Sequence, residues 1–285
     1  MFDDLFPRIP LGEWVEQGIA FLLAHCSGMT RWMSVEMNAF LTAVEGALLS
    51  IHPLIPIVIA TIGIGFLTRK RALTLFVFFS LGLIWNMGLW AESMSTLVLV
   101  LVSATLAVGI GVPLGIAAAV YSCLHRAIMP ILDMMQTMPA FVYLIPAIPF
   151  FGLGKVSALF ATMIFATPPA IRFTYLGIRQ VPKELVECAE AFGATRTQRL
   201  FKLELPIAAP TIVAGINQTI MLALSMVVVA AMIGAKGLGG AVWRAIQRLE
   251  MGSGFEAGLC IVILAICLDR VLQSLVERIR TKTRV

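Results

Sequence analysis

Long apolar segments constrain this chain more than any other feature of its sequence. A helix needs roughly 20 apolar residues to cross the hydrocarbon core of a bilayer. Windows of about that length recur seven times between charged residues, at approximately 47–67, 73–90, 94–124, 129–151, 156–176, 207–233 and 254–275. The first is the weakest, because His52, Pro53 and Pro56 interrupt it. The sequence therefore predicts an all-α fold, a polytopic membrane bundle of about seven transmembrane helices.

The composition supports this class. Of 285 residues, 59% are hydrophobic and 13% are charged, whereas soluble domains carry about 25% charged residues. The 23 Gly and 14 Pro favour helices that pack closely or kink over a barrel of alternating strands. No separate soluble domain is evident.

Basic residues predict the orientation, because Lys and Arg concentrate in cytoplasmic loops. If seven spans alternate across the membrane, 15 of the 21 Lys and Arg lie on one side, which we expect to be the cytoplasm. The N-terminus then lies outside and the C-terminus in the cytoplasm. The net charge of +5 fits a protein surrounded by anionic lipid and requires no nucleic acid.

Three regions follow from this topology: an outer N-terminal tail at 1–45, a transmembrane domain at 46–280 and a cytoplasmic tail at 281–285. The outer tail begins with acidic residues, so we expect no cleavable signal peptide. Its apolar residues, including Trp14, Phe21, Trp32 and Phe40, suggest amphipathic helices. These helices either lie on the outer membrane interface or pack against the bundle.

Residues that carry enzyme chemistry are scarce. The five cysteines form no CxxC pair, and the three histidines have no partner at metal-ligand spacing. Nucleotide-binding loops, GxSxG elbows and HExxH motifs are also missing from the sequence. We therefore expect no catalytic residue and no metal site. Energy for transport against a gradient would come from ions or from another subunit.

A charged segment at 179–206 interrupts the apolar pattern between two predicted spans. Pro182 suits the start of a short helix, and Gly193 can adopt the left-handed conformation that closes one. Thr195 and Gln198 form a capping-box pattern that begins a second helix, which Pro206 would end or join to the next span. Spacing alone leaves open whether this helix-turn-helix binds a protein or lies solvated at the lipid interface.

The same segment resembles the EAA loop of ABC importer permeases. That motif reads EAA, three residues, Gly, nine residues, an aliphatic residue, any residue, Leu and Pro. The matching positions in this chain are Glu187, Ala189, Gly193, Leu203, Leu205 and Pro206. Cys188 replaces the usual middle Ala, and Leu203 stands where Ile is common.

Further segments at 111–115, 136–154, 165–182 and 214–239 resemble the permease subunit of glycine betaine/proline betaine ABC importers, and the resemblance covers approximately 46–278. It implies the type I, MetI-like permease fold in a bacterial inner membrane. The six motif residues would form a coupling helix and its flanks, which dock onto a cytoplasmic ATPase. The implied partners are two such ATPase subunits, an extracytoplasmic substrate-binding protein and a second permease copy. ATP and Mg²⁺ would be bound by the ATPase, with no cofactor in this chain.

The implied function is import of glycine betaine or proline betaine for osmoprotection. The same machinery could carry choline or carnitine, and an ion-coupled secondary carrier is an alternative of another class. Such a carrier predicts inverted repeats and a buried ion site, and the sequence reveals neither. Candidate residues for the translocation path are Asn217, Gln218, Ser225 and Phe141. Polar side chains within a span face either a water-filled path or a hydrogen-bonding partner helix.

Overall fold

The computed structural model describes residues 10–283, and every regular element in that range is a helix. The twelve α-helices are α1 (Leu11–Ser50), α2 (Leu54–Thr68), α3 (Arg71–Asn86), α4 (Trp90–Val120), α5 (Ser122–Thr137), α6 (Leu144–Phe151), α7 (Lys155–Arg179), α8 (Lys183–Ala191), α9 (Arg196–Arg199), α10 (Leu205–Ala231), α11 (Leu238–Arg248) and α12 (Met251–Thr283). A 3₁₀-helix, η1 (Ala140–Tyr143), precedes α6, and a π-helical turn, η2 (Leu200–Glu204), joins α9 to α10. The predicted all-α fold is confirmed.

Four helices in the described residues are long and apolar enough to cross a membrane: Trp90–Val120, Lys155–Arg179, Arg196–Ala231 and Met251–Ser274. Two bent pairs could raise the number of spans to six. The predicted windows at 47–67 and 129–151 fall within these bent pairs, and the window at 73–90 becomes the 16-residue helix α3. The prediction of about seven transmembrane helices thus counted some segments as full spans although they are bent or short in the structure.

Prolines explain both bends. The chain turns by 99° between α1 and α2, next to Pro53, and by 114° between α5 and η1, at Pro139. Proline cannot donate a backbone hydrogen bond and disfavours a helical conformation in the residue before it. Pro113, by contrast, lies inside the continuous helix α4, and Pro168 and Pro169 lie inside α7.

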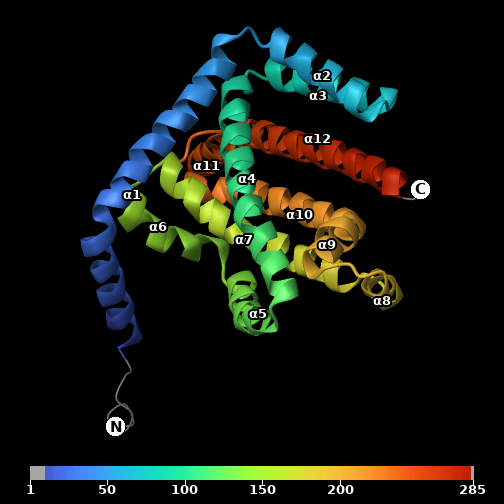
Figure 1. The fold of residues 1–285 in the computed structure, drawn as a ribbon. Helices are drawn as coiled ribbons and strands as arrows, with labels where there is room; N and C mark the ends of the chain where they lie inside the picture. Colours follow the sequence, from blue (N-terminus) through green and yellow to red (C-terminus); the bar gives the residue numbers. More distant parts are fainter. Residues whose placement is uncertain (1–9, 284–285) are drawn as a thin grey trace, which may run out of the picture.

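Helix α7 lies at the centre of the bundle, between α4 and α10 (Figure 1). Small residues let these helices approach closely. A Cβ atom at Gly111 of α4 would lie 2.6 Å from the Cβ of Ala170, and one at Gly215 of α10 would lie 2.5 Å from the Cβ of Phe173. Because membrane helices associate mainly through close packing, small residues at such contacts stabilise the bundle.

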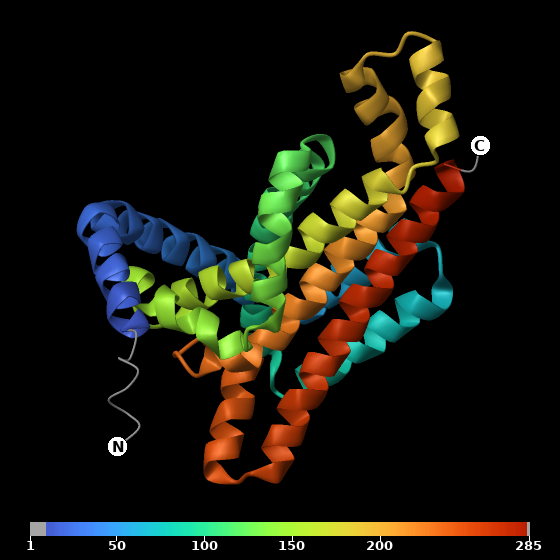
Figure 2. The same cartoon turned by 90° about the horizontal axis from the view of Figure 1, so that it is seen from below.

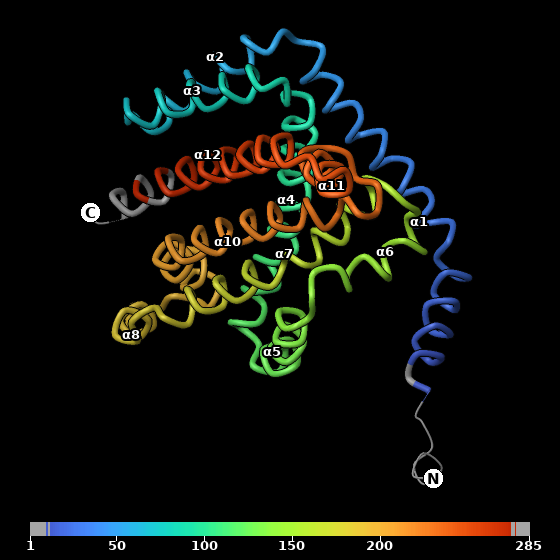
Figure 3. The backbone as a smooth tube through the Cα atoms, turned by 180° about the vertical axis from the view of Figure 1, so that it is seen from behind, coloured from blue at the N-terminus to red at the C-terminus, as the bar shows by residue number. Residues whose placement is uncertain are grey.

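Helices α11, α12, α2 and α3 extend the bundle on the side of α10 and α4 (Figure 3). One apolar cluster joins α2, α3, α4 and α12 through Ile57, Ile84, Met94 and Leu264. A second cluster joins α4 and α10 to the middle of α12. The helices therefore form a continuous packed layer rather than independent hairpins.

Helix α1 is a single helix of 40 residues, and the boundary predicted at residue 45 lies inside it. Trp14, Phe21, Trp32 and Phe40 are exposed, whereas Leu41 is buried among residues of α4, α6 and α7. The C-terminal part of α1 is thus part of the packed bundle.

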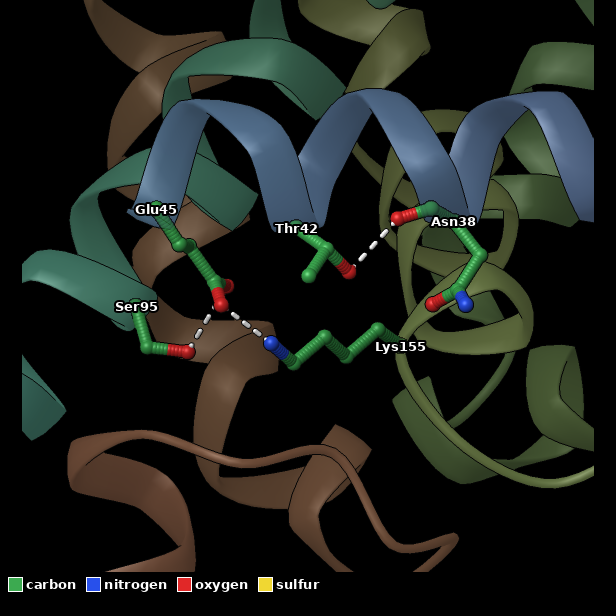
Figure 4. A network of polar contacts seen from close by, with 5 residues as sticks. All are labelled: Asn38, Thr42, Glu45, Ser95 and Lys155. Atoms are coloured by element: carbon green, nitrogen blue, oxygen red, sulfur yellow. Dashed lines mark hydrogen bonds and ion pairs between the residues drawn. The ribbon is translucent and has the colours of Figure 1, made fainter. Parts of the chain in front are cut away.

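A buried charged contact also joins α1 to the bundle (Figure 4). Glu45 is 8% exposed, and its carboxylate pairs with the ammonium of Lys155, the first residue of α7. The hydroxyl of Ser95 on α4 donates a hydrogen bond of 3.0 Å to the same carboxylate. Three helices thus converge on one buried carboxylate.

Candidate functional site: the charged segment between α7 and α10

The charged segment projects from one end of the bundle as α8, a turn and α9, opposite the hairpin formed by α11 and α12 (Figure 2). None of the residues of α8 is buried. Phe192, directly after α8, is 89% exposed. Because aromatic residues are enriched in protein interfaces, Phe192 is a candidate contact residue.

The turn after α8 forms as the sequence predicts. Gly193 has a φ of +80°, a conformation that strains residues with a Cβ atom. Thr195 then caps α9. Its hydroxyl accepts a hydrogen bond of 3.3 Å from the backbone N–H of Gln198, and the side-chain oxygen of Gln198 accepts one of 2.9 Å from the backbone N–H of Thr195. The predicted capping box is therefore confirmed.

The second helix does not end at Pro206. Residues Arg196–Ala231 form one helical run of 36 residues, in which η2 leads directly into α10. Pro206 is the second residue of α10, directly after the π-helical turn η2, and the wider turn lets the helical run continue past a residue that cannot donate a backbone hydrogen bond. Of the two outcomes that the sequence allowed, the structure has the one in which the helix joins the span.

Arg199 connects the projecting helix to the span. Its guanidinium pairs with Glu190 of α8 and, through Nε, with Oε1 of Glu204 at 2.7 Å. Glu204 is only 8% exposed, so this carboxylate depends on its partner for charge compensation. The sequence motif does not identify Arg199, Glu190 or Glu204 as a connected group, because their contacts depend on the folded turn.

A shallow hollow of about 440 Å³ lies in the bend of this segment. Three motif residues, Ala189, Gly193 and Leu203, line it together with Phe192 and Arg199. Glu187 is exposed on α8, while Leu205 and Pro206 lie at the start of α10, outside the hollow. Some of the motif residues thus line the hollow, and the others lie in the helices α8 and α10 that flank it.

The four candidate path residues do not meet in one chain. The Asn217 side-chain amide donates to Asp269 of α12 at 2.8 Å, so Asn217 makes an interhelical contact. Gln218 and Ser225 are exposed on α10, and the Ser225 hydroxyl donates to the carbonyl of Leu222. Phe141 is 57% exposed on η1, which contacts α10. Gln218, Ser225 and Phe141 are therefore exposed on the surface of a single chain.

Among the described residues, no group of three or more His, Cys, Asp and Glu side chains could hold a metal ion.

Comparison with known proteins places these features in a family. Residues 111–281 match the family described as "Binding-protein-dependent transport system inner membrane component". The chain is a member of this permease family. The match covers the charged segment together with α7, α10 and α12.

Two curated relatives of the permease extend the similarity to most of its length. It is 46% identical to the glycine betaine transport system permease protein OpuAB of Bacillus subtilis, covering 99% of both chains. It is 44% identical to the glycine betaine/proline betaine transport system permease protein ProW of Escherichia coli, covering 93% of this chain and 75% of ProW. A solved inward-facing structure of the MetNI methionine ABC transporter shares the fold, with 23% identity and a TM-score of 0.61 over 67% of this chain and 95% of that chain.

Family membership defines the role of the permease in a larger transport complex. It is the inner-membrane component of an ABC transporter, and its partners are a substrate-binding protein and separate subunits that hydrolyse ATP. The permease itself is therefore not an enzyme. The MetI-like fold expected from the sequence is confirmed by the MetNI comparison.

Proposed function

We propose that this permease imports glycine betaine or proline betaine as a compatible solute, driven by ATP hydrolysis in its partner subunits. The observation that carries this proposal is the similarity to OpuAB, which extends over 99% of both chains. A match of that extent includes the α1–α3 region as well as the permease core, so it concerns the whole chain. Osmoprotection follows as the physiological role.

In this proposal, α8 and the turn after it dock onto the ATPase. Glu187, Ala189, Gly193 and Leu203 form or flank the contact surface, and Leu205 and Pro206 begin the helix that transmits the movement. ATP and Mg²⁺ bind in the ATPase, and no cofactor binds in this chain. The ion pairs of Arg199 with Glu190 and Glu204 support this role, because they make α8 and the first turn of α10 move together.

A second copy of the permease completes the translocation path. Gln218, Ser225 and Phe141 are exposed in a single chain, although α10 and η1 are in contact. Polar groups in a span are costly when they face lipid. Two copies that meet along α10 would remove Gln218 and Ser225 from lipid and enclose a path between them, with Asn217 supporting it from the α12 side.

The proposed orientation puts the charged segment and the C-terminus in the cytoplasm and the N-terminus outside. Residues 1–45 then belong to an outer region, 46–280 to the transmembrane domain and 281–285 to a cytoplasmic tail, with 1–9 and 284–285 outside the described residues. Exposed apolar side chains on α2 and α3, such as Ile59, Phe66 and Phe79, would face membrane lipid.

Uptake into proteoliposomes tests the proposal. The permease is reconstituted with its ATPase subunits and its binding protein, and accumulation of labelled glycine betaine is measured. We expect accumulation only with ATP inside the vesicles, and competition by unlabelled proline betaine. Accumulation driven by an ion gradient without ATP would contradict the proposal. Stronger competition by choline or carnitine than by either betaine would assign the cargo to those amines.

A further inference from the structure

A groove between α3 and α12 combines apolar and basic residues at one end of the bundle. Its volume is about 410 Å³, and it is lined by Lys70 of the α2–α3 turn and by Leu73 and Phe76 of α3. From α12 come Ile266 and Arg270, followed by Gln273, Ser274 and Glu277. The two helices run side by side in Figures 1 and 3. They pack closely further along, where Val77 and Ile84 join Cys260 and Leu264 in one apolar cluster.

The groove lies at the same end of the bundle as the charged segment. Asn217 of α10 bonds to Asp269 of α12, and these helices run in opposite directions (Figure 2). The beginning of α10 and the residues of α12 beyond Asp269 therefore share one end. Because an ATPase must bind the charged segment from the cytoplasm, the groove faces the cytoplasmic leaflet.

The charges in the groove leave one cation uncompensated. Lys70 pairs with Glu277, so the only carboxylate among the described lining residues already has a cationic partner. Arg270 is exposed and forms no ion pair with any side chain that the structure describes. Arg69 and Arg71, on either side of Lys70, line a second hollow on the same α2–α3 turn. Four basic residues therefore lie at or next to the groove, compared with the two carboxylates of Glu277 and Asp269.

The apolar part of the groove is open. Phe76 and Ile266 are each 39% exposed, and both lie within one or two helical turns of a basic residue. The groove thus has basic residues at one end and apolar side chains beside them, an arrangement that fits an amphiphile with an anionic head and hydrocarbon chains. Basic pockets between transmembrane helices on the cytoplasmic side are suited to anionic phospholipid head groups.

We propose that this groove is a binding site for an anionic phospholipid of the cytoplasmic leaflet. Arg270 contacts the head-group phosphate, and an acyl chain lies along Leu73, Phe76 and Ile266. A bound lipid adds to the Lys70–Glu277 contact between the α2–α3 hairpin and α12.

Titration of the full-length permease with phospholipid, followed by native mass spectrometry, tests this site. The probes are phosphatidylglycerol and phosphatidylcholine with identical acyl chains. We expect a phosphatidylglycerol complex on the unmodified protein that phosphatidylcholine does not form at the same concentration. Arg270→Gln should weaken phosphatidylglycerol binding about fivefold, since a basic residue near anionic lipid contributes about that factor. Arg270→Lys should retain most of the binding.

Arg248→Gln is the matched control, because it removes another exposed arginine, at the end of α11, next to the start of α12 and away from the groove. It should bind phosphatidylglycerol as the unmodified protein does. Equal weakening by Arg248→Gln and Arg270→Gln would overturn the proposal, as would equal binding of the two lipids. Complete displacement of phosphatidylglycerol by inorganic phosphate would also overturn the proposal, because the groove would then bind anions in general and not a phospholipid. Circular dichroism verifies that each variant is folded. If Arg270→Gln does not fold, Arg270→Lys still tests the site.

Discussion

At the scale of single residues, Arg199 connects α8 to the helical run that contains the membrane span. Its guanidinium reaches one carboxylate on α8 and one on η2, directly before α10. A planar guanidinium can contact two acceptors at once, which a lysine ammonium on a flexible chain does less well. Gly193 has a complementary role, because its positive φ directs the chain back so that these groups can meet.

Replacing Arg199 should uncouple transport from ATP hydrolysis. Arg199→Ala removes both ion pairs and leaves the buried Glu204 carboxylate without its partner. We expect ATP-driven uptake to fall about tenfold, within the range typical of coupling between two sites, while the ATPase subunits still copurify. Arg199→Lys should give an intermediate rate. Uptake in reconstituted vesicles, normalised to the amount of assembled complex, provides the measurement.

The control for this experiment is Arg248→Ala. Arg248 lies 4.0 Å from Glu250, and both are exposed, so this contact contributes little. Uptake by the control should match that of the unmodified complex. Normal uptake by an Arg199→Ala complex would contradict the proposed role of these ion pairs in coupling.

At the scale of elements, the contact between α1 and the bundle depends on a buried charge pair. Glu45 and Lys155 are 110 positions apart, and both side chains are largely removed from solvent. Removing one member of such a pair destabilises a protein more than removing both, because the remaining charge stays buried without compensation. The pair therefore connects the N-terminal helix to the first turn of α7.

Lys155→Met should destabilise the permease by about 3 kcal/mol, the cost typical of an unpaired buried charge. The double variant Glu45→Gln/Lys155→Met should recover much of this loss, because the amide introduced at position 45 stays neutral. Thermal unfolding in detergent, followed by circular dichroism, measures both. Lys70→Met breaks a pair that is more than half exposed and should cost less than about 1 kcal/mol. Equal midpoints for the Lys155→Met single variant and the double variant would contradict the proposed charge effect.

At the scale of the whole molecule, the packing is asymmetric. Helix α7 is the most buried of the four long helices, with 72% of its most apolar window inside the chain, compared with 39% for the run that contains α10. Helix α10 keeps both polar and apolar residues exposed, and the polar ones include Gln218 and Ser225. Met232, directly after α10, is exposed as well. This face is where we expect the second copy.

A cross-linking experiment tests the dimer. The five native cysteines are first replaced, and Ser225→Cys is introduced as a single reactive site. A short bismaleimide should join two copies in membranes and give a dimer band on a denaturing gel. Ala223→Cys is the control, because Ala223 is fully buried within its own chain. The dimer model would be wrong if Ser225→Cys gave no more dimer than Ala223→Cys.

Local sequence patterns predicted much of the fold and part of the site. Apolar windows located the four long helices, because the cost of exposing polar backbone to lipid enforces helices wherever such a window spans the membrane. The turn at Gly193 and the capping box of Thr195 and Gln198 were also predictable, since each depends on contacts within three or four residues. Pro53 was among the residues that interrupted the first apolar window, although the sequence did not predict how sharply the chain bends there.

The sequence by itself therefore determined the membrane class, the helical segments and the family motif at 187–206. Only the tertiary structure decided that Arg199 contacts both Glu190 and Glu204, that Glu45 pairs with Lys155, and that Asn217 faces Asp269 while Gln218 and Ser225 stay exposed. The physical reason is range. Propensity, capping and hydropathy act over a few neighbouring residues. The Glu45–Lys155 and Asn217–Asp269 contacts instead join helices 110 and 52 positions apart in the chain, and the Arg199–Glu190 pair forms only when the turn at Gly193 brings α8 back onto the following helix.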